Sequence, residues 1–181
     1  MPLIWILLII AAVIAGWLAF WTLVSFLNNR SANHRRFLTG SIPADAPDGF
    51  YAGAAHIFFD RPTPWLGKSF AAADRLGFNI FRPAGGSLLR VLFPFYRKFG
   101  IADDGRALAF YFRTRTDDGL KDPGLKVVKL DYDAPENPFP IRIILDEIVE
   151  CAPGEYLGKI HLKVFPGFYS TIGFFGLKKP V

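Results

Sequence analysis

The side chains best suited to chemistry in this chain gather in one segment near its C-terminal end. Asp146, Glu147 and Glu150 precede Cys151, the only cysteine, and His161 follows. A cysteine beside a histidine and a carboxylate can act as a nucleophile when a nearby cation or helix N-terminus stabilises its thiolate. The acidic neighbours of Cys151 oppose the thiolate form, and no known nucleophile signature surrounds it. We therefore predict an inert, partly buried thiol.

Two other kinds of site stay open. His56 and His161 occupy matching places in the similar segments GFYAGAAHI and EYLGKIHL, and together they could form a metal or proton-relay site. A third strong ligand is not evident, so we predict no metal site. On a strand, Asp146 and Glu150 would share one face and Glu147 the other, which suits paired catalytic carboxylates or, by default, a solvated face.

Familiar catalytic and cofactor motifs are missing from the sequence. It contains no P-loop, GxGxxG, GxSxG or HExxH pattern, and each of these would mark a defined chemistry. We therefore predict a protein that is not an enzyme and uses no cofactor. An enzyme acting on membrane lipid through Cys151 and His161 is the remaining catalytic hypothesis.

The matching segments around the two histidines indicate repeated strands. Tyr51-Ala52-Gly53, Trp65-Leu66-Gly67 and Tyr156-Leu157-Gly158 share an aromatic-x-Gly unit. Glycine inside a strand usually marks a bulge, a bend or a close backbone approach. We expect these three strands to bend at equivalent places in a barrel.

From Gly49 onward the sequence has mainly the pattern of short strands. Turn sequences such as DDG, DPG and APG separate segments that alternate in polarity or are rich in β-branched and aromatic residues, at 108–113, 127–132, 141–149 and 156–164. Such spacing predicts an antiparallel sheet that closes into a barrel or sandwich. One stretch, 84–99, departs from it, and there we expect a helical turn from Ser87 that Pro94 kinks or ends. This segment either lies at the membrane interface or covers the barrel mouth or sheet face.

The uncharged C-terminal segment 164–177 allows two interpretations. It is too short to span a bilayer as a helix. It is either a pair of core strands that turn at Pro166-Gly167 or a Phe-rich edge that dips toward lipid.

The first 27 residues contain no charged side chain, and about 20 apolar residues suffice for a helix to cross a bilayer. A secretory signal peptide would start with a basic residue and have a shorter apolar stretch. We therefore predict a retained anchor. Small residues on this helix, which allow close approach of a second helix, include Ala12, Ala15, Gly16 and Ala19.

Charge predicts the orientation of the anchor. Basic residues favour the cytoplasmic side, and Arg30, Arg35 and Arg36 follow the span. We expect a single-pass protein of a bacterial inner membrane, with its N-terminus outside and its C-terminal domain in the cytoplasm. The side chains expected to contact the membrane are Trp5, Trp17, Trp21, Arg30, Arg35, Arg36, Phe93, Phe95, Arg97 and Lys98.

The whole chain is basic, with a formal net charge of +5. Its basic segments are also its aromatic ones, whereas residues 101–150 carry 7 basic against 11 acidic side chains. This separation fits a domain whose basic, aromatic pole faces a membrane. Nucleic-acid binding is disfavoured because no dense run of Lys and Arg exists.

Residues 49–53, GFYAG, followed by residues 65–70, WLGKSF, resemble the opening of small bacterial lipocalin-like (calycin) barrels. Those proteins pair a Gly-x-Trp first strand with a later Trp-x-Gly-Lys-x-Phe segment; here Tyr51 stands near the place of the first tryptophan. The resemblance covers about 20 residues. It implies a barrel with an apolar cavity that holds a hydrophobic ligand, and it carries over no catalytic residue.

These observations combine into one hypothesis about architecture and function. We expect a transmembrane helix at 1–28, a basic juxtamembrane linker at 29–47 and a β-rich, antiparallel, barrel-like domain at 48–181. The predicted function is non-catalytic binding of a lipid or other hydrophobic ligand at the membrane face, through Tyr51, His56, Phe58, Trp65, Phe110, Phe112, Tyr156 and His161. The alternative is an accessory subunit of a larger inner-membrane complex of photosynthetic or respiratory type, in which other subunits are partners.

Overall fold

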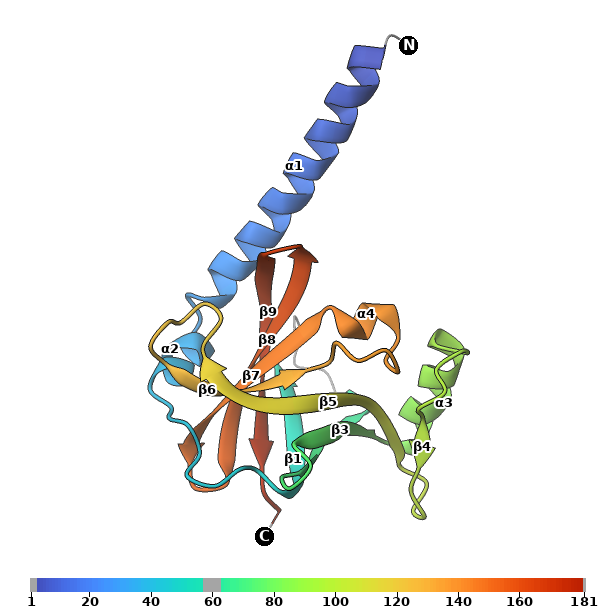
Figure 1. The fold of residues 1–181 in the computed structure, drawn as a ribbon, viewed down its shortest axis with the longest axis vertical. Helices are drawn as coiled ribbons and strands as arrows, with labels where there is room; N and C mark the ends of the chain where they lie inside the picture. Colours follow the sequence, from blue (N-terminus) through green and yellow to red (C-terminus); the bar gives the residue numbers. More distant parts are fainter. Residues whose placement is uncertain (1–2, 57–62, 181) are drawn as a thin grey trace.

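The computed structural model describes residues 3–56 and 63–180, with His56 described by its backbone alone. Helix α1, Leu3–Asn28, stands away from the rest of the chain (Figure 1). Among the described residues it is the one helix that is long and apolar enough to cross a membrane. Outside its last two turns, almost all of its side chains are exposed. Such exposure is expected for a helix that lies in lipid or for one that is removed as a signal peptide.

Eight antiparallel strands form a closed barrel, which confirms the predicted fold class. Strands that follow one another in the chain pair with each other, except at the short strand β4. The pairings of β1 with β9 and of β3 with β5 then close the ring. The short strand β4, Gly100–Ile101, pairs with β5 beside the barrel. The eight barrel strands are β1 Gly49–His56, β2 Trp65–Ala71, β3 Leu76–Phe81, β5 Ala107–Asp118, β6 Lys126–Asp131, β7 Ile144–Ala152, β8 Glu155–Phe165 and β9 Phe168–Lys178.

Alternation along the strands creates an inner and an outer core. The inner core fills the barrel and is rich in aromatic side chains, including Tyr51, Phe70 and Phe112. The outer core lies against the opposite faces of β6 to β9, where Phe37 packs on Val149, Leu157 and Phe174. Both faces of this part of the barrel are therefore buried.

Three short helices complete the fold, where the sequence predicted one. α2, Ala32–Leu38, begins at Ser31, whose side chain accepts a hydrogen bond from the backbone N–H of His34. It lies within the predicted linker, which is thus folded onto the barrel. α3, Pro83–Leu92, begins four residues earlier than expected, with proline in its first turn, and ends before Pro94. α4 is the short helix Phe139–Arg142.

The C-terminal segment forms β8 and β9, joined at Pro166-Gly167. This confirms the predicted pair of strands. Figure 1 shows the tip of this hairpin at the end of the barrel past which α1 rises, with α4 near the same end. The chain's C-terminus lies at the opposite end.

Candidate ligand-binding site

A cavity of about 290 Å³ lies inside the barrel, toward the end that carries α4 and the β8–β9 tip. Its walls are almost wholly apolar and come from seven strands and α4; they include Phe81, Ile160, Ile172 and Phe175. Thr63 on its rim is exposed, and Ile141, Ile144 and Ile172 are partly exposed. The cavity therefore reaches the surface at this end of the barrel.

Four polar side chains meet beneath these apolar walls: Lys68, Asn79, Tyr132 and Asp146. Lys68 Nζ lies 3.0 Å from Asp146 Oδ2 and 3.0 Å from Asn79 Oδ1, and it also donates to Tyr132 Oη. Tyr132 in turn donates to Asp146 Oδ2 over 3.1 Å. The ammonium thus uses all three of its donors. We call these four residues the polar floor.

One oxygen of the polar floor has no partner. Asn79 uses both ends of its amide, because Oδ1 also accepts from Trp65 Nε1 and Nδ2 donates to Phe110 O, each over 3.0 Å. Asp146 Oδ1 is buried and accepts no hydrogen bond from the described residues. A buried polar atom without a partner is uncommon in a folded protein and calls for an explanation.

Burial shifts the pKa values of two polar-floor residues, Lys68 and Tyr132. It lowers the pKa of Lys68, and the Asp146 carboxylate offsets only part of that effect. It raises the pKa of Tyr132 well above the ordinary value, because an anionic phenolate would be desolvated and would face Asp146. Aromatic rings surround the Lys68 ammonium, with the ring centres of Phe175 and Phe112 at 4.8 and 5.3 Å.

Phe110 adopts a strained backbone conformation beside the cavity. Its φ is +54°, in the left-handed region that non-glycine residues rarely occupy, at a bulge of β5 opposite β3. Its N–H donates to Tyr96 Oη over 2.7 Å, and its carbonyl accepts from Asn79. Burial raises the pKa of Tyr96 to about 12, so this phenol stays neutral. Strain of this kind clusters at binding sites.

The glycines of the aromatic-x-Gly units mostly make room for aromatic rings. A Cβ on Gly53 would lie 2.4 Å from the Trp65 ring, and one on Gly158 would lie 2.1 Å from that of Phe175. The expected bend occurs only at Gly67, where the pairing of β2 with β3 shifts after Trp65. The shared unit therefore reflects ring packing at two positions and a bulge at one.

The predicted ligand-binding residues occupy three different environments. Trp65 and Phe110 line the cavity. Tyr51, Phe112 and Tyr156 belong to the inner core and are absent from the cavity wall. Phe58 and the side chain of His56 lie outside the described residues.

His161 does not line the cavity, because its side chain projects from the outer face of β8. It is fully buried there, with Nε2 at 3.0 Å from Glu147 Oε2. Its Nδ1 lies 3.4 Å from Oγ1 of Thr171. Within the described residues, no group of three or more His, Cys, Asp and Glu side chains could hold a metal ion.

Cys151 and His161 are not a catalytic pair. His161 pairs with Leu145 across the β7–β8 hairpin, and six residues of β7 then separate it from Cys151, roughly 20 Å of strand. The thiol packs against the outer core around Phe37.

The carboxylates of β7 also differ from the default expectation of a solvated face. Asp146 and Glu147 lie on opposite sides of the strand, as alternation predicted, but both are buried, with 4 % and 0 % exposure. The reason is that each has a cationic or imidazole partner on another strand: Lys68 inside the barrel and His161 outside it.

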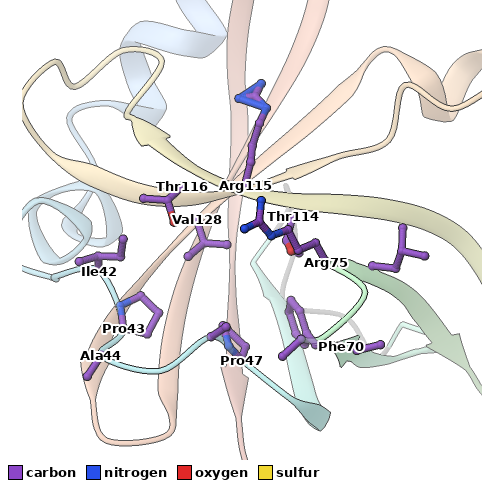
Figure 2. A pocket seen from close by; sticks show the side chains of 14 residues that line it. Ile42, Pro43, Ala44, Pro47, Phe70, Arg75, Thr114, Arg115, Thr116 and Val128 are labelled. Carbon is purple, nitrogen blue, oxygen red and sulfur yellow. The ribbon is translucent and has the colours of Figure 1, made fainter.

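A larger cavity, of about 520 Å³, lies at the opposite end of the barrel beneath residues 42–47. Figure 2 shows Arg75 reaching toward Thr114, whereas Arg115 points away from the cavity. Its charged residues are exposed on the surface, and Arg115 already lies 3.1 Å from Asp117. It offers no buried polar group to a ligand, so the smaller cavity is the better candidate.

Sequence reasoning assigned none of the four polar-floor residues to the ligand-binding site, although it considered Asp146 as a paired carboxylate. Each of them interrupts a set of inward-facing core residues, as Asp146 does between Ile144 and Ile148, and Tyr132 after Leu130. A polar residue in an apolar alternating set was therefore the available signal. What the sequence could not indicate is that these interruptions meet in space.

Comparisons of the chain with models of protein families, with curated proteins and with solved structures found no match. The likeness to lipocalin-like barrels is therefore one of shape alone, a closed barrel of eight antiparallel strands.

Proposed function

We propose that this protein is a non-catalytic, membrane-anchored barrel that binds a lipid or another hydrophobic ligand at the membrane face. The observation that carries this proposal is the apolar cavity with its buried polar floor. Small-molecule sites typically combine such walls with a few convergent polar groups. At about 290 Å³ the cavity lies at the small end of the usual range, about 300–1,000 Å³, so it suits one end of a long lipid.

The attachment of α1 supports a cavity that faces the membrane. Ser170 Oγ donates to the carbonyl of Trp21 over 2.8 Å, and the N–H of Thr171 donates to Ser25 Oγ over 3.2 Å. These bonds join the last two turns of the helix to β9. Removal of α1 as a signal peptide would expose Ser170 and Thr171, both of which are fully buried, so the contact favours a retained anchor.

The same contact relates the hairpin tip to the bilayer. Two further residues of β9 lead from Ser170 to Phe168, about 7 Å of strand, and one helical turn, about 5 Å, leads from Trp21 to Trp17. The tip therefore reaches about the level of Trp17. Exposed apolar side chains near this end include Phe165 at 64 % and Phe139 at 73 % exposure, which suits contact with the lipid interface.

Basic residues after α1 support the predicted orientation, with the N-terminus outside and the barrel in the cytoplasm. Arg35 and Arg36 lie on the exposed side of α2, where anionic headgroups of the inner leaflet would attract them. Phe95, at 93 % exposure, with Arg97 and Lys98 adds a second basic, aromatic surface. These features support the predicted membrane contacts of Arg35 and Arg36 and of Phe95, Arg97 and Lys98.

The test of the function is the molecule that the full chain carries. We expect a hydrophobic compound to copurify in mild detergent, detected by native mass spectrometry, and to be lost when Ile172→Trp places an indole in the cavity. Ile101→Trp is the matched control, because Ile101 is 57 % exposed on β4. An empty wild-type cavity would contradict the proposal, and copurification of other membrane subunits instead would favour the accessory-subunit alternative.

The membrane contact predicts a difference between the two ends of the barrel. With Cys151 replaced by serine, a fluorophore on Phe165→Cys should be quenched by brominated lipid in nanodiscs. The same fluorophore on Asp74→Cys, in the exposed β2–β3 turn, should not. Equal quenching at the two sites would show that this end of the barrel does not face the bilayer.

A further inference from the structure

Helix α3 carries an apolar stripe on its outer face. Leu88, Val91 and Leu92 are all exposed, Val91 to 77 %, and they lie at positions i, i+3 and i+4 of the helix. Side chains with this spacing share one face. Phe95, the most exposed of the large apolar residues here, follows just after the helix. Single apolar side chains are normal on a protein surface, whereas a continuous exposed group of them marks a contact with a partner or a membrane.

The opposite face of α3 is fixed on the barrel. Leu89 is buried in the inner core. Gly86 lets the helix approach closely, since a Cβ there would lie 2.8 Å from the Cβ of Ala107 on β5. Beyond the helix, Tyr96 Oη accepts the N–H of Phe110 over 2.7 Å. The helix therefore cannot turn to bury its stripe, which stays directed outward.

Basic side chains flank the stripe. The segment 82–99 contains no Asp or Glu, and its exposed basic residues are Arg82, Arg90, Arg97 and Lys98. The guanidinium carbon of Arg90 lies 5.1 Å from the centre of the Phe99 ring, which keeps this charge on the segment itself. An apolar helix face beside lysine and arginine is typical of segments that lie in the interface of an anionic membrane.

The end of α3 lies at the same level as two other exposed apolar groups. In Figure 1, a line drawn across α1 at right angles through the tip of the β8–β9 hairpin also passes near α4 and the upper end of α3. The tip carries Phe165 and α4 carries Phe139, both of which are exposed. Three separate elements therefore present apolar side chains toward one plane across the proposed anchor.

We propose that α3 is a second membrane-contact element, whose apolar stripe enters the bilayer interface while Arg90 and Arg97 bind the phosphate groups of anionic lipid. This inference rests on the proposed membrane anchor and adds a lipid partner for a surface outside the cavity. A helix of another subunit would also cover an apolar stripe. The basic flanks and the common level with the hairpin tip favour lipid.

Quenching by brominated lipid tests this inference in the full chain. With Cys151 replaced by serine, a fluorophore is placed on Val91→Cys in nanodiscs of brominated phosphatidylcholine, with or without phosphatidylglycerol. We expect stronger quenching with the anionic lipid and its loss at high salt, because each basic residue near an anionic surface favours contact by roughly fivefold. Adding Arg90→Gln and Arg97→Gln should weaken the quenching. Ile101→Cys is the matched control, because Ile101 is also exposed but β4 lies farther from the line across α1 (Figure 1).

Other results would overturn the inference. Quenching at Val91 as weak as at Ile101 would show that the stripe does not meet lipid, and equal quenching with and without phosphatidylglycerol would remove the role of the two arginines. A photo-cross-linker on Val91→Cys that captures a copurified subunit instead of lipid would assign the stripe to a protein.

Failure of this inference can be told apart from failure of the proposed function. If the fluorophore on Phe165→Cys is quenched while that on Val91→Cys is not, the barrel faces the bilayer and only the contact through α3 is wrong. If neither is quenched, the membrane-facing arrangement of the barrel is itself wrong.

Discussion

Replacing Lys68 by methionine alone should destabilise the protein by about 3–5 kcal/mol, because the Asp146 carboxylate then stays buried without its cation. Replacing both residues together, as Lys68→Met with Asp146→Leu, should restore most of that loss, since an apolar pair of similar volume removes both charges from the barrel interior. The measurement is the free energy of unfolding in urea, in one detergent for all variants.

An exposed ion pair provides the control. Lys126 Nζ lies 3.0 Å from Asp118 Oδ1, the same distance as in the Lys68–Asp146 pair, but both side chains are more than half exposed. Lys126→Met should therefore change the stability little. If Lys68→Met had the same free energy of unfolding as the double variant, an unpaired Asp146 carboxylate would not destabilise the barrel, which would contradict the prediction.

Gly67→Ala should destabilise the barrel by about 2–5 kcal/mol. The φ of Gly67 is +145°, which a side chain rarely allows, and a Cβ there would lie 2.0 Å from the backbone oxygen of Tyr51. Strain and overpacking each contribute about 1–3 kcal/mol. Because the obstructing atom belongs to the backbone of a paired strand, a rotamer change cannot relieve the contact. Thermal unfolding followed by circular dichroism measures the loss.

Gly176→Ala is the matched control for this prediction. Gly176 also lies within a barrel strand, but a Cβ on it meets nothing within 4 Å and its φ is not positive. Alanine there should be neutral or slightly stabilising, because it reduces the freedom of the unfolded chain. Equal melting temperatures for the two variants would contradict the close approach of β1 and β2.

The architecture could be predicted from the sequence because its signals are local. Alternation and turn residues define β5 to β9, and Pro166-Gly167 marks the last hairpin. The sequence did not predict α2, because its seven residues, ANHRRFL, resemble a polar linker as long as the packing partners of Phe37 are unknown. Its burial depends on Val149 and Phe174, more than a hundred residues away.

The site also depends on contacts between residues that are distant in the chain. Lys68 and Asp146 are 78 residues apart in the chain and meet only because the barrel closes. Each looked like an ordinary exposed strand residue when taken alone. The three aromatic-x-Gly units gave a correct indication of strands, but which ring each glycine admits follows from the pairing of β1 with β2 and of β8 with β9.

Hydrogen bonds from Ser170 and Thr171 join the barrel to the end of α1. A transmembrane helix tilts when the bilayer becomes thinner than its apolar length. If α1 spans a bilayer as proposed, the barrel should tilt with it, so that membrane thickness would set the angle at which the cavity meets the lipid. Under that proposal, a thinner membrane would bring a different part of the cavity rim into contact with the headgroups.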